Sequence, residues 1–247
     1  MTDKPNLVPN IAKRLQVSNF EAGYVLPVDK PYAWTSTDVV RKVKTLLRNK
    51  AGLKKIKVGH AGTLDPLATG LLIICIGKAT KNIETIQLGE KEYVADICFG
   101  TTTPSFDLET SPDCHYPFEH IAAADIANAF AGFVGDTEQL PPLFSAKLIA
   151  GKRAYDYARI GETPELKPAK INIRSLELID YKPPVARIRM NCSKGTYVRA
   201  FARDLGTALG SGAHLAKLRR TASGAYGIES ALSIDEVEDM FTLIDSL

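Results

Sequence analysis

The chain has 247 residues and a mass of 26.9 kDa, and 45% of its residues are hydrophobic and 24% charged. These values lie close to the averages of soluble globular proteins and exclude a disordered tail, a collagen and a coiled coil. The longest apolar stretch, 71–76, is far shorter than the roughly 20 residues of a membrane span, and the first residues lack the apolar region of a signal peptide. We therefore expect a cytoplasmic protein without a membrane segment.

The charged residues are segregated along the sequence, although the net charge is only +3. One basic cluster lies between residues 38 and 60 and a second between 187 and 220, and each contains eight lysines and arginines against one acid. Residues 229–247 carry acids but no lysine or arginine. Solvated helix faces would explain either cluster alone, whereas two clusters and an acidic tail favour a polyanionic partner.

Residues 1–19 are polar and aperiodic, and we expect them to form an arm before a single globular region of residues 20–247. Apolar spacing predicts strands and helices without strict alternation, which favours an α+β fold around a mixed, largely antiparallel sheet flanked by helices. A first helix is expected after a cap at Thr35, Ser36 or Thr37, ending by Gly52. The other expected elements are strands over 24–28 and 71–76, a helix over 79–88, a strand over 93–99, a helix over 121–133, strands over 171–179 and 185–192, a helix over 196–209, a strand over 215–222 and a helix over 234–244.

Two common catalytic patterns fail their templates. The segment 70–80 resembles a phosphate-binding loop, but six residues separate its glycines where the template has four, and Ala79 stands where a hydroxyl residue should follow the lysine. The four histidines are dispersed, and no cysteines are paired in the manner of a metal site. We therefore expect neither nucleotide hydrolysis nor a bound metal ion.

A glycine-punctuated loop over 59–70, with the sequence GHAGTLDPLATG, follows the first basic cluster. Its glycines allow the backbone to approach a ligand, and Pro66 fixes a turn that aims the preceding carboxylate of Asp65. An Asp-Pro pair also serves as an ordinary turn former or helix cap. A second constellation lies over 192–199, where a predicted helix begins among cations; this indicates either an anion site or an ordinary capped helix.

Several long motifs occur along the chain: GHAGTLDPLATG around Asp65, KEY at 91–93, PPLFSAKLIAGKRAYDYAR at 141–159, CSKGTYVRAFARDLG at 192–206 and GAHLAKLRR at 212–220. Together they resemble the TruB family, the bacterial tRNA pseudouridine-55 synthases, from about residue 24 to residue 227. The resemblance implies the pseudouridine synthase fold in one catalytic domain, with a thumb-loop insertion at about 137–161. It also implies an isomerase that converts a uridine in the T loop of tRNA to pseudouridine and needs no cofactor.

The resemblance also assigns roles to individual residues. Asp65 matches the catalytic carboxylate, which could attack the ribose, attack the base or remove a ribose proton. Arg199 would pair with Asp65 and keep it ionised. Tyr93 would stack on the target base and serve proton transfer at C5, and Tyr197 would line the same pocket. A uridine in a folded loop must be flipped out to reach that pocket, and His60 matches the residue that stacks in the vacated place.

Basic side chains would bind the RNA backbone, which makes affinity depend on salt. The expected RNA contacts are Lys30, Lys78, Lys147, Lys152, Arg153, Lys194, Arg219 and Arg220. Many family members continue into a small RNA-binding module called PUA, which we expect this protein to lack, and we expect a monomer. The competing interpretation is a non-catalytic RNA-binding or tRNA-folding protein on the same scaffold, which the basic clusters alone would favour equally.

Overall fold

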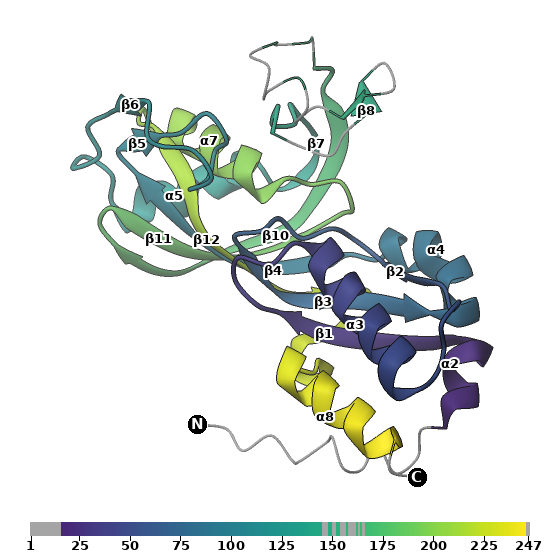
Figure 1. Ribbon diagram of the computed structural model, residues 1–247. Helices are drawn as coiled ribbons and strands as arrows, with labels where there is room; N and C mark the ends of the chain where they lie inside the picture. The colour runs from purple at the N-terminus through teal and green to yellow at the C-terminus, as the bar shows by residue number, and fades with distance from the viewer. Residues whose placement is uncertain are drawn as a thin grey trace. The chain divides into compact units, whose positions relative to one another are not determined.

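The structure is a computed structural model (Figure 1). It describes residues 16–144 and 166–245 and, between them, residues 148–149, 152–153, 157, 162 and 164. The chain folds as two compact units. Unit 1 comprises the residues up to Gly89 together with those from Arg219 onward, and unit 2 runs from Glu90 to Leu218.

The strands of unit 1 are built around one strand with an unbroken apolar run. This strand, β3, pairs antiparallel with β1 from Tyr24 opposite Ile76 to Lys30 opposite Gly70. Every residue from 71 to 76 is buried, as a strand with both faces covered requires. The strands of this unit are β1 (Tyr24–Lys30), β2 (Val58–His60), β3 (Ala68–Ile76), the end of β12 (Ala213–Ser223), which adjoins β3, and β13 (Tyr226–Gly227).

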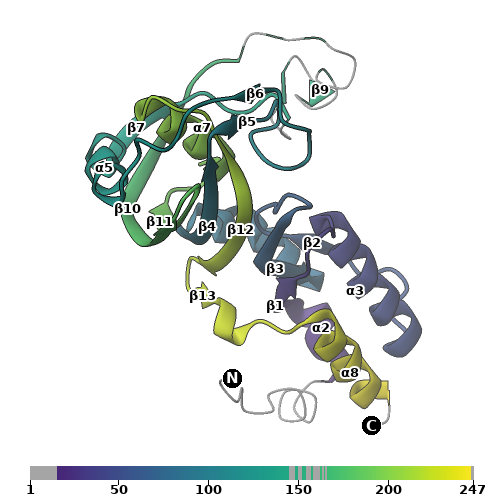
Figure 2. The same cartoon turned by 90° about the vertical axis from the view of Figure 1, so that its left-hand side faces the viewer.

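The helices of unit 1 bury apolar stripes against this sheet and one another. The N-cap of α3 is Thr35, whose hydroxyl accepts a hydrogen bond from the Asp38 amide at 3.0 Å, and the Asp38 carboxylate accepts one from the Thr35 amide at 2.9 Å. Helix α8 packs beside α3 and α2 (Figure 2), and the rings of Phe20 and Phe241 stack 5.3 Å apart. The helices are α2 (Val17–Gly23), α3 (Ser36–Lys50), the 3-10 helix η1 (Gly77–Asn82), α4 (Ile83–Leu88), the 3-10 helix η3 (Ile228–Ser230) and α8 (Ile234–Asp245).

Unit 2 contains four strands paired antiparallel in the order β4, β11, β10, β7. Strand β4 pairs with β11, β11 with β10, and β10 with β7. Helices α5 and α7 belong to this unit, and the rings of Phe133 and Phe201 meet edge to face at 5.1 Å. The elements are β4 (Lys91–Phe99), β5 (Thr101–Thr102), β6 (Cys114–His115), α5 (Ala123–Ala129), the 3-10 helix η2 (Phe130–Gly132), β7 (Gly135–Gln139), β8 (Leu148–Ile149), β9 (Lys152–Arg153), β10 (Ala169–Lys182), β11 (Val185–Cys192), α7 (Val198–Ala208) and the start of β12.

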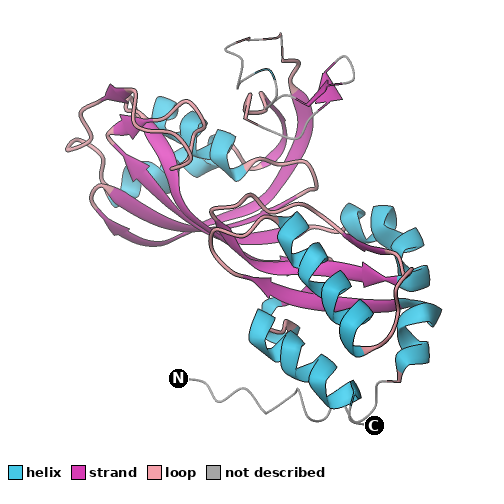
Figure 3. Cartoon of the chain, viewed as in Figure 1, coloured by secondary structure: helices cyan, strands magenta, loops and turns pink. Residues whose placement is uncertain are grey.

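The α+β class with a largely antiparallel sheet is confirmed, and both units combine strands with helices (Figure 3). Each expected strand and helix is present, but the expected helix over 79–88 begins as the 3-10 helix η1. Helix α2 begins at Val17, so residues 17–19 of the expected arm are helical. Much of the expected thumb insertion lies outside the described residues. The single catalytic domain and the absence of a PUA module stay predictions.

Within the described part of the chain, the helices are too short or too polar to cross a membrane.

Candidate active site

The glycine-punctuated loop of the sequence joins β2 to β3 in unit 1. Asp65 is half-buried at its centre, and its carbonyl accepts a hydrogen bond from the Ala68 amide at 3.1 Å. At the start of the loop, the Ala61 amide donates to the Ile73 carbonyl at 2.8 Å. The loop is therefore closed onto the buried strand β3, and Asp65 stands on a turn rather than in a helix cap.

Two buried side chains hold the residues on either side of Asp65. The Ser36 hydroxyl donates to the Leu64 carbonyl at 2.9 Å and accepts from the Leu64 amide at 2.8 Å. The Lys30 ammonium, on a side chain with no exposed surface, donates to the Pro66 carbonyl at 3.2 Å. Because Leu64 and Pro66 flank Asp65, these bonds restrict the backbone that carries its carboxylate.

A third clamp comes from Arg220 on β12, which is 1% exposed. Its guanidinium donates to the carbonyls of Leu71 at 2.7 Å and Gly62 at 2.9 Å, and lies 3.5 Å from that of Thr63. The strands approach closely here: a Cβ on Gly70, whose φ is 99°, would meet the Arg220 carbonyl oxygen at 2.3 Å. Only glycine fits this position, so the sequence brings Arg220 under the loop.

Lys30 and Arg220 were predicted as RNA contacts, and the structure places both inside unit 1. Their charged groups bind backbone carbonyls of the Asp65 loop and of the turn that follows β1. Buried cations require such partners, because an unpaired charge away from water is costly. Their geometry is that of loop-positioning residues.

Burial lowers the pKa of Lys30 to about 8 from its ordinary value near 10.5, and the nearby Asp65 carboxylate opposes this shift. The folded protein therefore holds fewer protons than the unfolded chain between about pH 8 and 10.5. By linkage, the contribution of Lys30 to the free energy of unfolding rises with pH through that window.

We expect the stability of the wild type, relative to a Lys30→Met variant, to increase by about 2 kcal/mol between pH 7 and pH 9.5. The comparison cancels the titration of other groups, including Tyr24 and Cys75, whose pKa values burial raises. Urea unfolding of both proteins at the two pH values measures the difference. A difference that stays constant or shrinks with pH would show that folding does not lower the pKa of Lys30.

His60 ends β2, at the entrance to the loop. Burial, together with the nearby charge of Arg220, holds the pKa of His60 below its usual range. Its buried Nδ1 atom has no hydrogen-bond partner among the described residues. The ring is therefore neutral at pH 7, a state suited to stacking on a nucleobase rather than to pairing with a phosphate.

Two of the other predicted active-site residues, both tyrosines, lie in unit 2. Tyr93 is 8% exposed on β4, opposite Met190. Tyr197 precedes α7 and is half-buried; the Gln139 side chain accepts from its amide at 2.8 Å and donates to its carbonyl at 3.1 Å. Gln139, which the sequence analysis did not single out, thus fixes the Tyr197 backbone at both polar atoms.

Arg199 is also in unit 2, where it forms a buried ion pair with Asp107. Its Nε lies 3.5 Å from the Asp107 carboxylate, and the two side chains are 4% and 6% exposed. Arg199 also donates to the Ser105 carbonyl at 3.2 Å, and the Glu109 amide donates to Asp107 at 3.0 Å. The sequence analysis missed Asp107, because nothing marks it among the polar residues of its loop. The pairing of Arg199 with Asp65 of unit 1 stays a prediction.

The remaining expected RNA contacts differ in accessibility. Lys78 and Lys194 are exposed. Arg219 makes two hydrogen bonds to the Asp29 carboxylate, at 3.0 and 2.7 Å, and is 42% exposed. Lys152 and Arg153 form strand β9, and Lys147 lies outside the described residues. The roles of these residues in RNA binding stay predictions.

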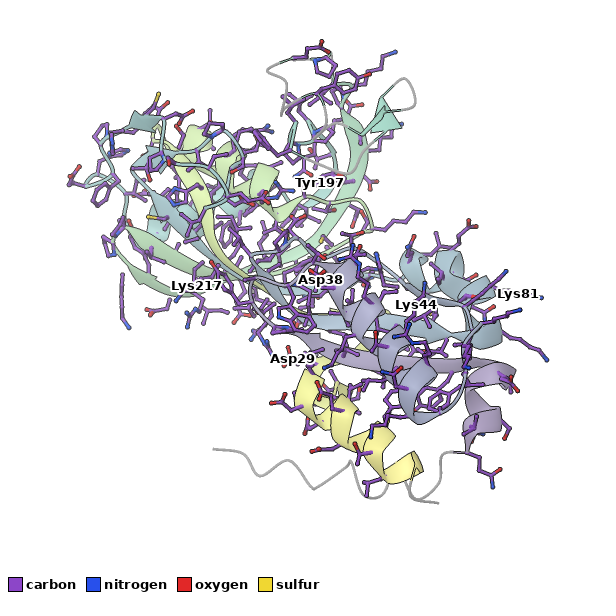
Figure 4. All side chains as sticks on the ribbon, in the orientation of Figure 1. Asp29, Asp38, Lys44, Lys81, Tyr197 and Lys217 are labelled. Carbon is purple, nitrogen blue, oxygen red and sulfur yellow. The ribbon has the colours of Figure 1, made fainter. Side chains whose placement is uncertain are left out.

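Unit 1 also carries a basic surface that the first cluster of the sequence and η1 form together. Two neighbouring hollows share the segment 53–56, one reaching Lys57, Lys78 and Lys81 and the other reaching Lys44 and Arg48. Figure 4 shows Lys44 on α3 and Lys81 on η1. We call this set the lysine surface: Lys44, Arg48, Lys54, Lys55, Lys57, Lys78 and Lys81.

No group of three metal-binding side chains occurs among the residues that the structure describes.

Family models match almost the whole chain after residue 47. The model of the TruB family pseudouridylate synthase N-terminal domain matches residues 48–198, and that of the tRNA pseudouridylate synthase B C-terminal domain matches residues 199–246. The chain belongs to the TruB family. The proteins named tRNA pseudouridine synthase B from Phocaeicola vulgatus and Parabacteroides distasonis are 54% and 52% identical to it over 88% and 90% of this chain, and over 92% and 94% of their own lengths.

Solved structures agree with the TruB assignment. A chain in the crystal structure of a Cbf5–Nop10–Gar1 complex matches with a TM-score of 0.69 at 26% identity; the match covers 92% of this chain and 57% of that one. The predicted fold family and enzyme class are confirmed: this TruB protein is an isomerase of the tRNA pseudouridine synthase class.

Proposed function

We propose that this protein converts the uridine at position 55, in the T loop of tRNA, to pseudouridine, and that Asp65 is its catalytic carboxylate. The observation that carries the proposal is the clamped loop around Asp65. Ser36, Lys30 and Arg220 fix the backbone before and after this residue, in a segment that a pseudouridylate synthase family model matches. Such preorganisation is what a reacting group requires.

The reaction explains why one carboxylate suffices. The bond from ribose C1′ to uracil N1 breaks, the base turns, and a bond from C1′ to C5 forms; C5 then loses its proton and N1 takes one up, so the composition of the nucleotide is unchanged. No atom is gained and no electron is exchanged. Asp65 can serve by attacking the ribose, attacking the base or removing a ribose proton, and each of these roles requires an ionised carboxylate.

The proposal includes flipping of the target base. A uridine in the T loop is stacked and must leave its stack, at a cost of a few kcal/mol. We propose that the neutral ring of His60 stacks where the base was, and that Tyr93 stacks on the flipped base. His60 is half-buried and Tyr93 nearly fully buried.

We propose that the lysine surface supplies phosphate contacts outside the reacting centre. Its seven cations lie in unit 1 together with the Asp65 loop. Phosphate contacts from lysine and arginine dominate RNA affinity and weaken as salt rises. The partner is therefore a tRNA, bound mainly through its backbone, by a protein that we propose to be monomeric and cytoplasmic.

Tritium release tests the function. With a T-arm stem-loop made from C5-tritiated uridine, we expect the wild-type protein to release at most one tritium per RNA molecule, from the uridine at position 55. A matched transcript with cytidine at position 55 is expected to release none. Release that continues at the same rate from the cytidine transcript would contradict the assigned position.

The alternative function is RNA binding or tRNA folding without catalysis, which the lysine surface favours. It predicts salt-sensitive binding and no tritium release, both from the stem-loop and from full-length tRNA. Repeating the measurement on full-length tRNA distinguishes this outcome from a requirement for a larger substrate.

A further inference from the structure

The turn between β1 and α3 carries an exposed aromatic side chain. Tyr32 is 59% exposed, and among the described residues no large hydrophobic side chain is more exposed; Leu88 equals it. The Tyr32 hydroxyl has no hydrogen-bond partner within the described part of the chain. More than half of the surface of Tyr32 is therefore available to a ligand.

This turn is joined to the Asp65 loop on both sides of the catalytic carboxylate. The Lys30 ammonium donates to Pro31 O at 3.0 Å and Trp34 O at 2.5 Å, and the same nitrogen donates to Pro66 O at 3.2 Å. At the other end, Ser36 makes its two bonds to Leu64. Tyr32 therefore directly follows Pro31, whose carbonyl accepts a hydrogen bond from Lys30. The same ammonium also binds the carbonyl of Pro66, the residue after Asp65.

The backbone of the turn is held in one conformation. Ala33 has a φ of 65°, a region that residues other than glycine rarely adopt and that costs on the order of 1 kcal/mol or more. The bonds of Lys30 to the carbonyls on either side of Tyr32 and Ala33 maintain this conformation. The ring of Tyr32 is therefore presented on a rigid support, which reduces the entropy lost when a ligand stacks on it.

We propose that Tyr32 is a stacking platform for an unpaired base beside the target uridine. This inference rests on the proposed function. Single-stranded RNA loops are recognised through bases that stack on exposed aromatic side chains. When the target base leaves the loop, its neighbours lose a stacking partner, and an aromatic ring fixed next to the Asp65 loop replaces it. Tyr32 contributes to substrate binding and does not take part in bond making.

The first test compares Tyr32→Ala and Tyr32→Phe with the wild type in tritium release from the T-arm stem-loop. Loss of one stacked base predicts that Tyr32→Ala raises KM about tenfold while kcat changes less than about twofold. Tyr32→Phe keeps the ring and is expected to retain the wild-type KM. The control is Leu88→Ala, which removes an equally exposed apolar side chain of unit 1 and should leave KM unchanged.

The second test identifies the base. Stem-loops with a single abasic nucleotide at each position flanking the target are assayed with the wild type and with Tyr32→Ala. One abasic position should raise KM for the wild type and have little further effect on the variant, since both changes remove the same stack. The proposal would be overturned if, at every position, the abasic nucleotide raised the KM of Tyr32→Ala by the same factor as that of the wild type. An unchanged KM for Tyr32→Ala would also overturn it. So would an equal rise in KM for Tyr32→Phe.

The outcomes separate this inference from the proposed function. A wild-type protein that releases no tritium from any tRNA substrate contradicts the function itself. A wild-type protein that releases tritium, while Tyr32→Ala matches it in KM and in melting temperature, contradicts only the role of Tyr32.

Discussion

Replacement of Asp65 by asparagine is expected to reduce tritium release by more than about a thousandfold, because a neutral amide cannot act as nucleophile or base. The amide has the shape of the carboxylate, and the clamp holds the backbone of the flanking residues Leu64 and Pro66. We therefore expect the loop to keep its conformation. The dissociation constant for the T-arm stem-loop should stay within about threefold, since phosphate contacts dominate affinity.

Glu84→Gln is the matched control for Asp65→Asn. It makes the same change of carboxylate to amide at an exposed position of α4, in the same unit. Its turnover should equal that of the wild type. If Asp65→Asn and Glu84→Gln released tritium at equal rates, Asp65 would not be the catalytic residue, although the family assignment would stand.

The local apolar patterns were sufficient to predict most elements of the fold, and the failures have identifiable causes. The six consecutive apolar residues of β3 would expose apolar surface unless both faces of the strand were buried, so a buried strand could be predicted there. The tight turn into η1 was not predictable from that pattern. A Cβ on Gly77 would meet the Phe20 carbonyl oxygen at 2.0 Å, and this contact joins distant parts of the sequence.

Helix α2 shows a similar limit. Its surrounding sequence is polar, and its one fully buried residue is Phe20, whose ring stacks on Phe241 of α8. That partner is far away in the sequence, so no local period could indicate it. A short helix of this kind is stabilised by tertiary packing and not by its own propensity.

The same reasoning applies to the candidate site. The glycines and the proline around Asp65 drew attention to this residue, and the resemblance to the TruB family assigned it the catalytic role, which stays a prediction. The sequence could not show that Lys30 and Arg220 bind backbone carbonyls of the Asp65 loop. Charge alone does not distinguish a cation that faces phosphate from one that faces the backbone. The carbonyls of the Asp65 loop point inward and need donors, and these two cations supply them.

Arg220→Lys is expected to lower kcat about a hundredfold while changing KM little, because a displacement of about 1 Å at a reacting group costs this much. Lysine keeps the positive charge, but its single ammonium cannot replace the separate nitrogens that reach Leu71, Gly62 and Thr63. Carbonyls left without a donor should also lower the free energy of unfolding by about 1–3 kcal/mol. Steady-state tritium release and urea unfolding measure the two effects.

Arg219→Lys is the comparison that decides between positioning and RNA contact, since both arginines were predicted to touch RNA. Arg219 is the adjacent residue of the same strand, but it is 42% exposed and binds the Asp29 carboxylate. The same substitution there should affect KM more than kcat, and its loss of stability should be smaller, because an ion pair at the surface contributes about 0–1 kcal/mol. If Arg220→Lys instead raised KM and left kcat unchanged, the buried guanidinium would not be what holds Asp65 in place.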